Sequence, residues 1–137
     1  MNPAGILLDT GPLVALLSAK DGQHERAKQL FATCTAPFRT CEAVIAEACF
    51  LMRQIDPEGP AEVVALARKG LFEIALGVED EWAELEVLLR KYKTRRISLA
   101  GACLIRCAER HGEPRILTFD ADFRIYRWSR NKPFQMM

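Results

Sequence analysis

The chain has 137 residues, of which 50% are hydrophobic and 27% are charged. This composition is close to that of globular proteins and excludes an intrinsically disordered chain. No apolar run approaches the ~20 residues of a membrane-spanning helix, and the first residues lack the features of a signal peptide. We therefore expect a cytoplasmic protein without membrane contact, folded as a single domain over residues 1–137.

The charge is unevenly distributed along the chain, although the net charge is only +1. Residues 1–89 contain 7 basic and 14 acidic side chains, whereas residues 90–137 contain 12 basic and 4 acidic ones. A basic half of this kind can bind a polyanion such as RNA. It can equally form an ordinary surface that is neutralised by the acidic half in the folded protein, and the sequence leaves both interpretations open.

The five cysteines do not indicate a disulfide framework, because their number is odd and no Cys-x-x-Cys motif is present. Cys103 and Cys107 are four residues apart in an expected helix, so both could face one metal ion. Burial in the core is the favoured interpretation, since cysteine behaves as a small apolar residue.

The first half of the chain alternates short strands with helices. Residues 6–8 form an apolar run that ends in a turn, and Pro12 can open the following helix. A second helix is expected over residues 24–32 and a weak strand over residues 37–40. Thr40 is the expected N-cap of a helix over residues 41–53.

The same alternation continues beyond a Pro- and Gly-rich break at residues 56–60. Expected elements are a helix over residues 61–69, a strand over 71–76, an amphipathic helix over 79–92 with Trp82 on its apolar face, a helix from Ser98 to residue 110 and a strand over 115–119. Alternating strands and helices predict an α/β fold with three layers, α/β/α, around a mainly parallel central sheet.

Acidic residues follow the first and the last expected strand. Asp9 comes directly after the first strand, Asp120 directly after the last, and Asp122 two residues later. Ligands of open parallel sheets bind beyond the carboxyl ends of the strands. The three carboxylates therefore gather at one edge of the sheet if these two strands are neighbours.

Glu47 is unusual because it interrupts the apolar run of residues 44–52. A buried carboxylate needs a partner, and a cation shared with the other acids would supply one. Exposure on a narrow polar stripe, or pairing with an arginine, explains Glu47 equally well at this stage. Oxygen ligands without histidine select Mg²⁺ or Mn²⁺, and such ions can activate water and stabilise charge on a phosphodiester.

The order and spacing of these segments resemble the PIN domain family, and more specifically its VapC-type ribonuclease toxins. The resemblance spans nearly the whole chain. The segments on which it rests are residues 6–11 with 13–17, Glu47 in its apolar helix, residues 98–109 and residues 116–123.

This resemblance implies a Mg²⁺- or Mn²⁺-dependent endoribonuclease with a PIN-like fold. Three acidic positions would surround the metal and the attacking water, one acid would be auxiliary, and two hydroxyls would order the site. In this chain the three positions around the metal are Asp9, Glu47 and Asp120, and the auxiliary acid is Asp122. The two ordering hydroxyls are those of Thr10 and Thr118. The resemblance also implies an RNA substrate, a homodimer and a cognate antitoxin protein that blocks the site.

One position departs from the family pattern, because Gly101 stands where an aspartate is usual. Glycine inside a helix costs roughly 1 kcal/mol relative to alanine. If Ser98 is the N-cap, residue 101 is also the position at which an acid completes a capping box. A packing glycine is possible, but we favour a lost carboxylate and expect impaired metal binding and RNA cleavage.

Two other functions are compatible with the sequence. A non-catalytic PIN-like module could bind RNA or antitoxin through its basic half. A phosphotransfer enzyme could use Asp9 as nucleophile, although Gly11 provides neither the acid nor the hydroxyl expected two residues later.

Overall fold

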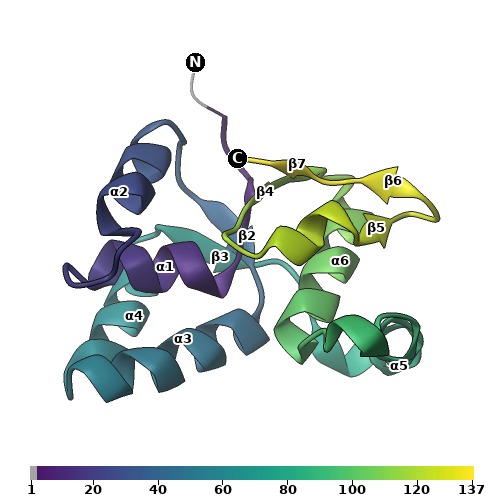
Figure 1. Ribbon diagram of the computed structural model, residues 1–137, viewed down its shortest axis with the longest axis horizontal. Helices are drawn as coiled ribbons and strands as arrows, with labels where there is room; N and C mark the ends of the chain where they lie inside the picture. Colours follow the sequence, from purple (N-terminus) through teal and green to yellow (C-terminus); the bar gives the residue numbers. More distant parts are fainter. Residues whose placement is uncertain (1–2) are drawn as a thin grey trace.

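The computed structural model describes residues 3–137 and contains a five-stranded parallel sheet in the order β3-β2-β1-β4-β7 (Figure 1). Two further strands, β5 and β6, form a separate antiparallel ribbon. The strands are β1 (Leu7–Leu8), β2 (Phe38–Thr40), β3 (Phe72–Ile74), β4 (Arg115–Leu117), β5 (Arg127–Trp128), β6 (Lys132–Pro133) and β7 (Gln135–Met136).

Helices connect the strands and cover both faces of the sheet, which confirms the expected three-layer α/β/α architecture (Figure 1). The α-helices are α1 (Thr10–Leu17), α2 (His24–Ala32), α3 (Glu42–Ile55), α4 (Gly59–Arg68), α5 (Trp82–Lys91) and α6 (Leu99–His111). Three short 3-10 helices are η1 (Val78–Asp80), η2 (Lys93–Arg95) and η3 (Ala121–Arg124). Among residues 3–137, no helix is long and apolar enough to cross a bilayer.

The core has two halves because successive strand residues face opposite sides of the sheet. Leu7 belongs to the half that packs against α5 and α6, while Leu8 belongs to the half beneath α1, α3 and α4. Cys103 and Cys107 are fully buried in the first half, which confirms their role as core residues. Strand β1 is thus covered on both faces, as its uninterrupted apolar sequence predicts.

The register of the sheet determines where the acidic residues lie. In the central strand β1, Leu7 pairs with Arg39 of β2 and Ile116 of β4, and Leu8 pairs with Leu117. The two strands that precede the acids are therefore neighbours, as the acidic-edge prediction requires.

Three local expectations are corrected by the structure. Thr40 does not cap α3, because Cys41 is its N-cap and the Thr40 hydroxyl donates instead to the Leu8 carbonyl across 2.8 Å. Trp82 is 61% exposed rather than part of the apolar face, since α5 starts later than expected and buries Leu85 and Leu88. The tail after Asp122 adds a fifth strand to the sheet beside β4, which its basic composition did not indicate.

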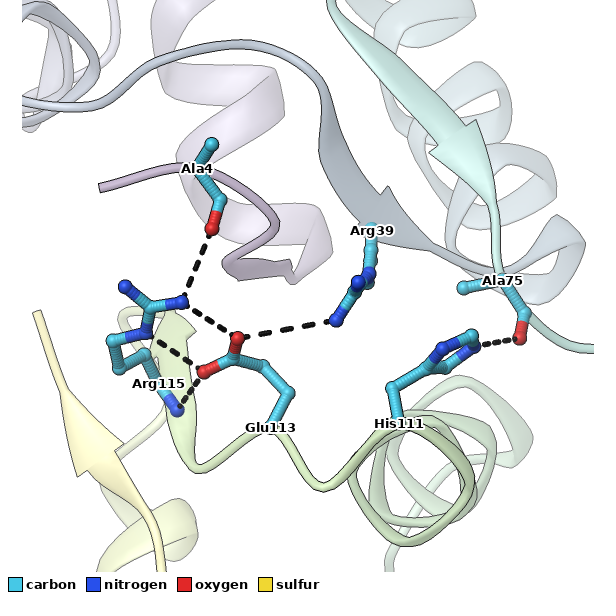
Figure 2. Close-up of polar contacts among 6 residues, drawn as sticks. All are labelled: Ala4, Arg39, Ala75, His111, Glu113 and Arg115. Atoms are coloured by element: carbon cyan, nitrogen blue, oxygen red, sulfur yellow. Dashed lines mark hydrogen bonds and ion pairs between the residues drawn. The ribbon is translucent and has the colours of Figure 1, made fainter. Parts of the chain in front are cut away.

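A buried ion-pair cluster anchors the opposite, amino-terminal edge of β4 (Figure 2). Glu113 is 6% exposed and accepts hydrogen bonds from the Arg115 backbone N–H, Nε and Nη2 at 2.7 to 2.9 Å. Arg39 lies 3.9 Å away, and Arg115 also donates to the Ala4 carbonyl. Burial opposes ionisation of Glu113, but these arginines outweigh it and lower its pKa. Two basic side chains are thus committed to structure rather than to a ligand.

Candidate functional site

A pocket of about 280 Å³ opens beyond the carboxyl ends of β1 and β4. Its lining combines three carboxylates, two glycines, two hydroxyl residues and three aromatic rings, namely Asp9, Glu47 and Asp120, Gly11 and Gly101, Thr10 and Ser98, and Phe119, Phe123 and Tyr126. The sheet edge that the sequence predicts as the ligand site is therefore hollowed and acidic.

Asp9 lies between β1 and α1 and is the N-cap of that helix. Its Oδ1 accepts a hydrogen bond from the Thr10 N–H at 2.8 Å, and its Oδ2 accepts one from the Thr118 hydroxyl at 2.7 Å. Burial nevertheless raises the pKa of Asp9 above its ordinary value, and the negative charges of Asp120 and Glu47 raise it further. Within the described residues 3–137, no ion pair compensates the Asp9 carboxylate, which favours a bound cation.

Thr118 couples the two acids that follow the central strands. Its hydroxyl donates to Asp9 and also accepts the backbone N–H of Asp120 at 3.0 Å. Thr118 is 2% exposed, so its surroundings in the core hold this geometry in place. Asp120 itself is exposed and caps η3 by accepting the Asp122 N–H at 2.9 Å. One hydroxyl of Thr118 thus connects Asp9 and Asp120.

The remaining predicted acids lie in different surroundings. Glu47 lines the pocket from α3 but is exposed, and no ion pair to an arginine is formed within residues 3–137. Asp122 does not line the pocket and lies 3.7 Å from Arg95 Nη1 on η2. The structure therefore groups Asp9, Glu47 and Asp120 around the cavity and pairs Asp122 with Arg95 outside its lining.

The carboxylates are not drawn tightly together. Within the described part of the chain, no three histidine, cysteine or acidic side chains are gathered closely enough to hold a metal ion by themselves. Mg²⁺ usually retains several waters and is bound through only one or two carboxylates plus substrate phosphate. The raised pKa of Asp9 and the donor side chains of the lining, all of which are oxygen groups, fit such an ion.

Gly101 lacks the expected carboxylate, and Thr10 lacks a hydrogen-bond partner for its hydroxyl within residues 3–137. Gly101 is the third residue of α6, and its N–H donates to the Ser98 hydroxyl at 3.0 Å, so the expected N-cap is confirmed. Gly101 presents no carboxylate to the cavity that it lines. Thr10, the second residue with an expected ordering role, has a buried hydroxyl oxygen for which residues 3–137 provide no hydrogen-bond partner.

The aromatic part of the lining was not foreseen from the sequence. The Arg26 guanidinium lies over the Phe119 ring, with its Cζ 5.0 Å from the ring centroid. Tyr126 lines the pocket although it lies far along the basic tail. The only signal in the sequence was the aromatic character of that tail. Recognising Tyr126 as a pocket residue required knowledge of how η3 folds back.

Comparisons with known proteins agree with this geometry. The PIN domain family model matches residues 6–128. No curated protein matched the sequence. Among solved structures, the chain is similar to VapC20 of Mycobacterium tuberculosis, described as a toxin that cleaves the sarcin-ricin loop, with 24% sequence identity, a TM-score of 0.70, and coverage of 85% of this chain and 91% of that one. The family match over most of the chain, together with the sheet order and the acidic edge, shows that this protein belongs to the PIN domain family.

Proposed function

We propose that this chain is a VapC-type endoribonuclease that hydrolyses RNA phosphodiester bonds with Mg²⁺ or Mn²⁺. The observation that carries the proposal is the coupling of Asp9 and Asp120 through Thr118 at the pocket wall. Family membership and the fold of VapC20, described as a toxin that cleaves the sarcin-ricin loop, support the same chemistry.

In this mechanism Asp9 and Asp120 would hold the divalent ion, and such an ion would supply charge neutralisation at the phosphate and an activated water. Thr118 keeps the Asp9 carboxylate oriented toward the cavity through its 2.7 Å hydrogen bond. Glu47 lines the same pocket from α3 and is exposed to solvent, where its carboxylate would accept the proton of the attacking water. Asp122 would act indirectly, because it is paired with Arg95 and anchors η3 beside Asp120.

The absence of an acid at Gly101 defines a further part of the proposal. With three carboxylates that do not converge and none from α6, the site holds its metal weakly and cuts RNA slowly. The pocket keeps three of the acids but has less negative charge to attract the ion.

Metal dependence and the role of Asp9 are tested together in a single-turnover assay with radiolabelled RNA. We expect EDTA to abolish cleavage and Asp9→Asn to slow it by at least about 100-fold, because the amide cannot neutralise the ion. The assay is run on the chain and on its Gly101→Asp variant, so that weak activity remains measurable. Glu84→Gln is the matched control, since Glu84 is an exposed acid on α5 outside the pocket. Cleavage that survives EDTA or Asp9→Asn would contradict the proposal.

A non-catalytic RNA- or antitoxin-binding module is the second candidate, and the missing carboxylate at Gly101 favours it. Such a module would bind RNA through basic side chains, with an affinity that falls steeply with salt and is indifferent to chelator. Chelator-insensitive RNA binding without cleavage, in the chain and in Gly101→Asp alike, would select this candidate.

We also propose a homodimer and a cognate antitoxin as partners, as the family resemblance implies. Support comes from exposed apolar side chains on α3 and α4, where Phe50 is 53%, Ile55 51% and Val64 55% exposed. Exposed apolar surface of this kind is typical of protein interfaces. Analytical ultracentrifugation of the purified chain is expected to give twice the mass of 15.4 kDa. A monomer at micromolar concentration would refute the homodimer.

A further inference from the structure

Tyr126 is held rigidly in the wall of the acidic pocket. The residue is only 2% exposed, yet it lines the cavity together with Asp9 and Asp120. Its ring packs edge-on against Tyr92, with centroids 4.9 Å apart, and against Phe123, with centroids 5.0 Å apart. Two aromatic contacts from different elements thus fix the direction in which the phenol points.

The Tyr126 hydroxyl has no hydrogen-bond partner within residues 3–137, whereas the other tyrosine of the chain is satisfied. The Tyr92 hydroxyl accepts the Arg127 N–H at 3.1 Å. Among residues 3–137 the Tyr126 hydroxyl is not one of the fully enclosed polar atoms, so it is accessible from the pocket although its ring is buried. Tyrosine hydroxyls of buried rings normally find a hydrogen-bond partner, and one that is unpartnered and open to a pocket is available to a ligand.

The surroundings determine which role this hydroxyl can have. Burial raises the pKa of Tyr126 to about 12, with further contributions from Asp120, Asp122 and Asp9. The phenol therefore remains protonated at neutral pH and acts as a donor, not as a base. A phosphate oxygen, which must enter a pocket walled by carboxylates, requires such a donor in addition to a cation.

We propose that the Tyr126 hydroxyl donates a hydrogen bond to a non-bridging oxygen of the RNA phosphodiester in the pocket. This inference rests on the proposed ribonuclease function and adds a substrate-binding residue to it. Tyr126 supplies a neutral donor to the pocket that Gly101 also lines, where α6 offers no side chain at that position. The hydroxyl holds the phosphate beside Asp9 and Asp120 without adding a positive charge that would compete with the metal.

Tyr126→Phe tests the proposal because it removes the hydroxyl and retains the ring contacts. Single-turnover cleavage of RNA with Mn²⁺ is measured against protein concentration, with every variant made in the Gly101→Asp background. The catalytic efficiency of Tyr126→Phe is expected to be about tenfold lower than that of its Gly101→Asp parent, the size typical of a lost hydrogen bond to a charged group. Tyr92→Phe is the matched control and should leave the efficiency unchanged, since its hydroxyl bonds only to backbone. Equal efficiencies for Tyr126→Phe and the parent would overturn the inference and leave the ribonuclease function intact. Absence of cleavage in every variant would instead overturn both.

A second readout does not depend on turnover. The chain has only two tyrosines, so 3-fluorotyrosine labelling gives two ¹⁹F resonances, which Tyr126→Phe assigns. Addition of adenosine 5′-monophosphate with Mg²⁺ is expected to shift the Tyr126 resonance and not that of Tyr92, while Mg²⁺ alone has a smaller effect. Equal shifts with Mg²⁺ alone and with the nucleotide, or no shift of Tyr126, would show that the hydroxyl does not contact phosphate.

Discussion

Gly101→Asp is expected to accelerate Mn²⁺-dependent RNA cleavage by roughly 100-fold, an effect of the size found when the ligand environment of a catalytic metal is completed or disrupted. The new carboxylate would enter the pocket that already holds Asp9, Glu47 and Asp120. A fourth negative charge there would raise metal affinity, since the existing three are too far apart to hold an ion by themselves. The measurements are single-turnover cleavage and Mn²⁺ affinity by isothermal titration calorimetry.

The helix can accept this side chain with a small adjustment. A Cβ at residue 101 would lie 3.1 Å from Cγ1 of Ile97, a half-buried side chain packed against the core, which must shift by a few tenths of an ångström. Replacing a helical glycine offsets part of that cost, because glycine is roughly 1 kcal/mol less favourable than alanine in a helix. An acid in the first turn is also stabilised by the helix dipole.

Two matched variants separate charge from packing. Gly101→Ala adds the Cβ without a carboxylate, and Gly101→Asn adds a side chain of the same shape as aspartate without the charge. Neither is expected to raise cleavage or Mn²⁺ affinity. If all three variants behave like the parent, the glycine is a packing residue and the lost-carboxylate hypothesis is wrong.

Glu81→Ala is expected to lower the free energy of unfolding by about 3 kcal/mol, at the lower end of the range for removal of one member of a buried ion pair. Glu81 is 2% exposed and accepts hydrogen bonds from Arg106 Nε and Arg110 Nε, both at 2.6 Å. The Arg106 side chain is 15% exposed and would keep only Glu109, whereas Arg110 is 52% exposed and would regain water. Urea unfolding followed by circular dichroism measures the change.

Glu86→Ala is the control for this variant. Glu86 pairs with Arg90 on the surface of α5, where the two side chains are 64% and 78% exposed. Such pairs contribute about 0.5 kcal/mol or less. A loss for Glu81→Ala no larger than that for Glu86→Ala would show that the buried cluster does not stabilise the fold.

The contribution of Glu81 should also depend on pH. Burial opposes ionisation of Glu81, but the hydrogen bonds from Arg106 and Arg110 outweigh it and lower the pKa below its ordinary value of 4.5. A lowered pKa in the folded state means that the stabilisation is complete above the unfolded-state value and disappears as pH falls through the folded-state value. The difference between parent and Glu81→Ala should therefore shrink from pH 7 to pH 3. A constant difference over this range would contradict the ionic origin of the stabilisation.

Local features of the sequence were sufficient to predict most of the framework. The apolar run before Asp9 forms β1, and the Ser98 hydroxyl caps α6 as its position indicates. These predictions succeed because periodicity and capping act over a few residues and do not depend on distant contacts. The positions of Asp9 and Asp120 at one edge follow from the same reasoning, since parallel strands end at the same side of a sheet.

The order of residues along the chain was thus sufficient for the fold class, the family resemblance, the acidic edge and the departure at Gly101. The three-dimensional fold was needed to show that Thr118 bridges the two acids, that Asp122 pairs with Arg95 and that Tyr126 lines the pocket. These outcomes depend on how η3 and the tail fold back against β4 and α6, through contacts between residues far apart in sequence. Burial, charge compensation and hydrogen-bond geometry set the properties of each acid, and none of these is encoded in the spacing of residues along the chain.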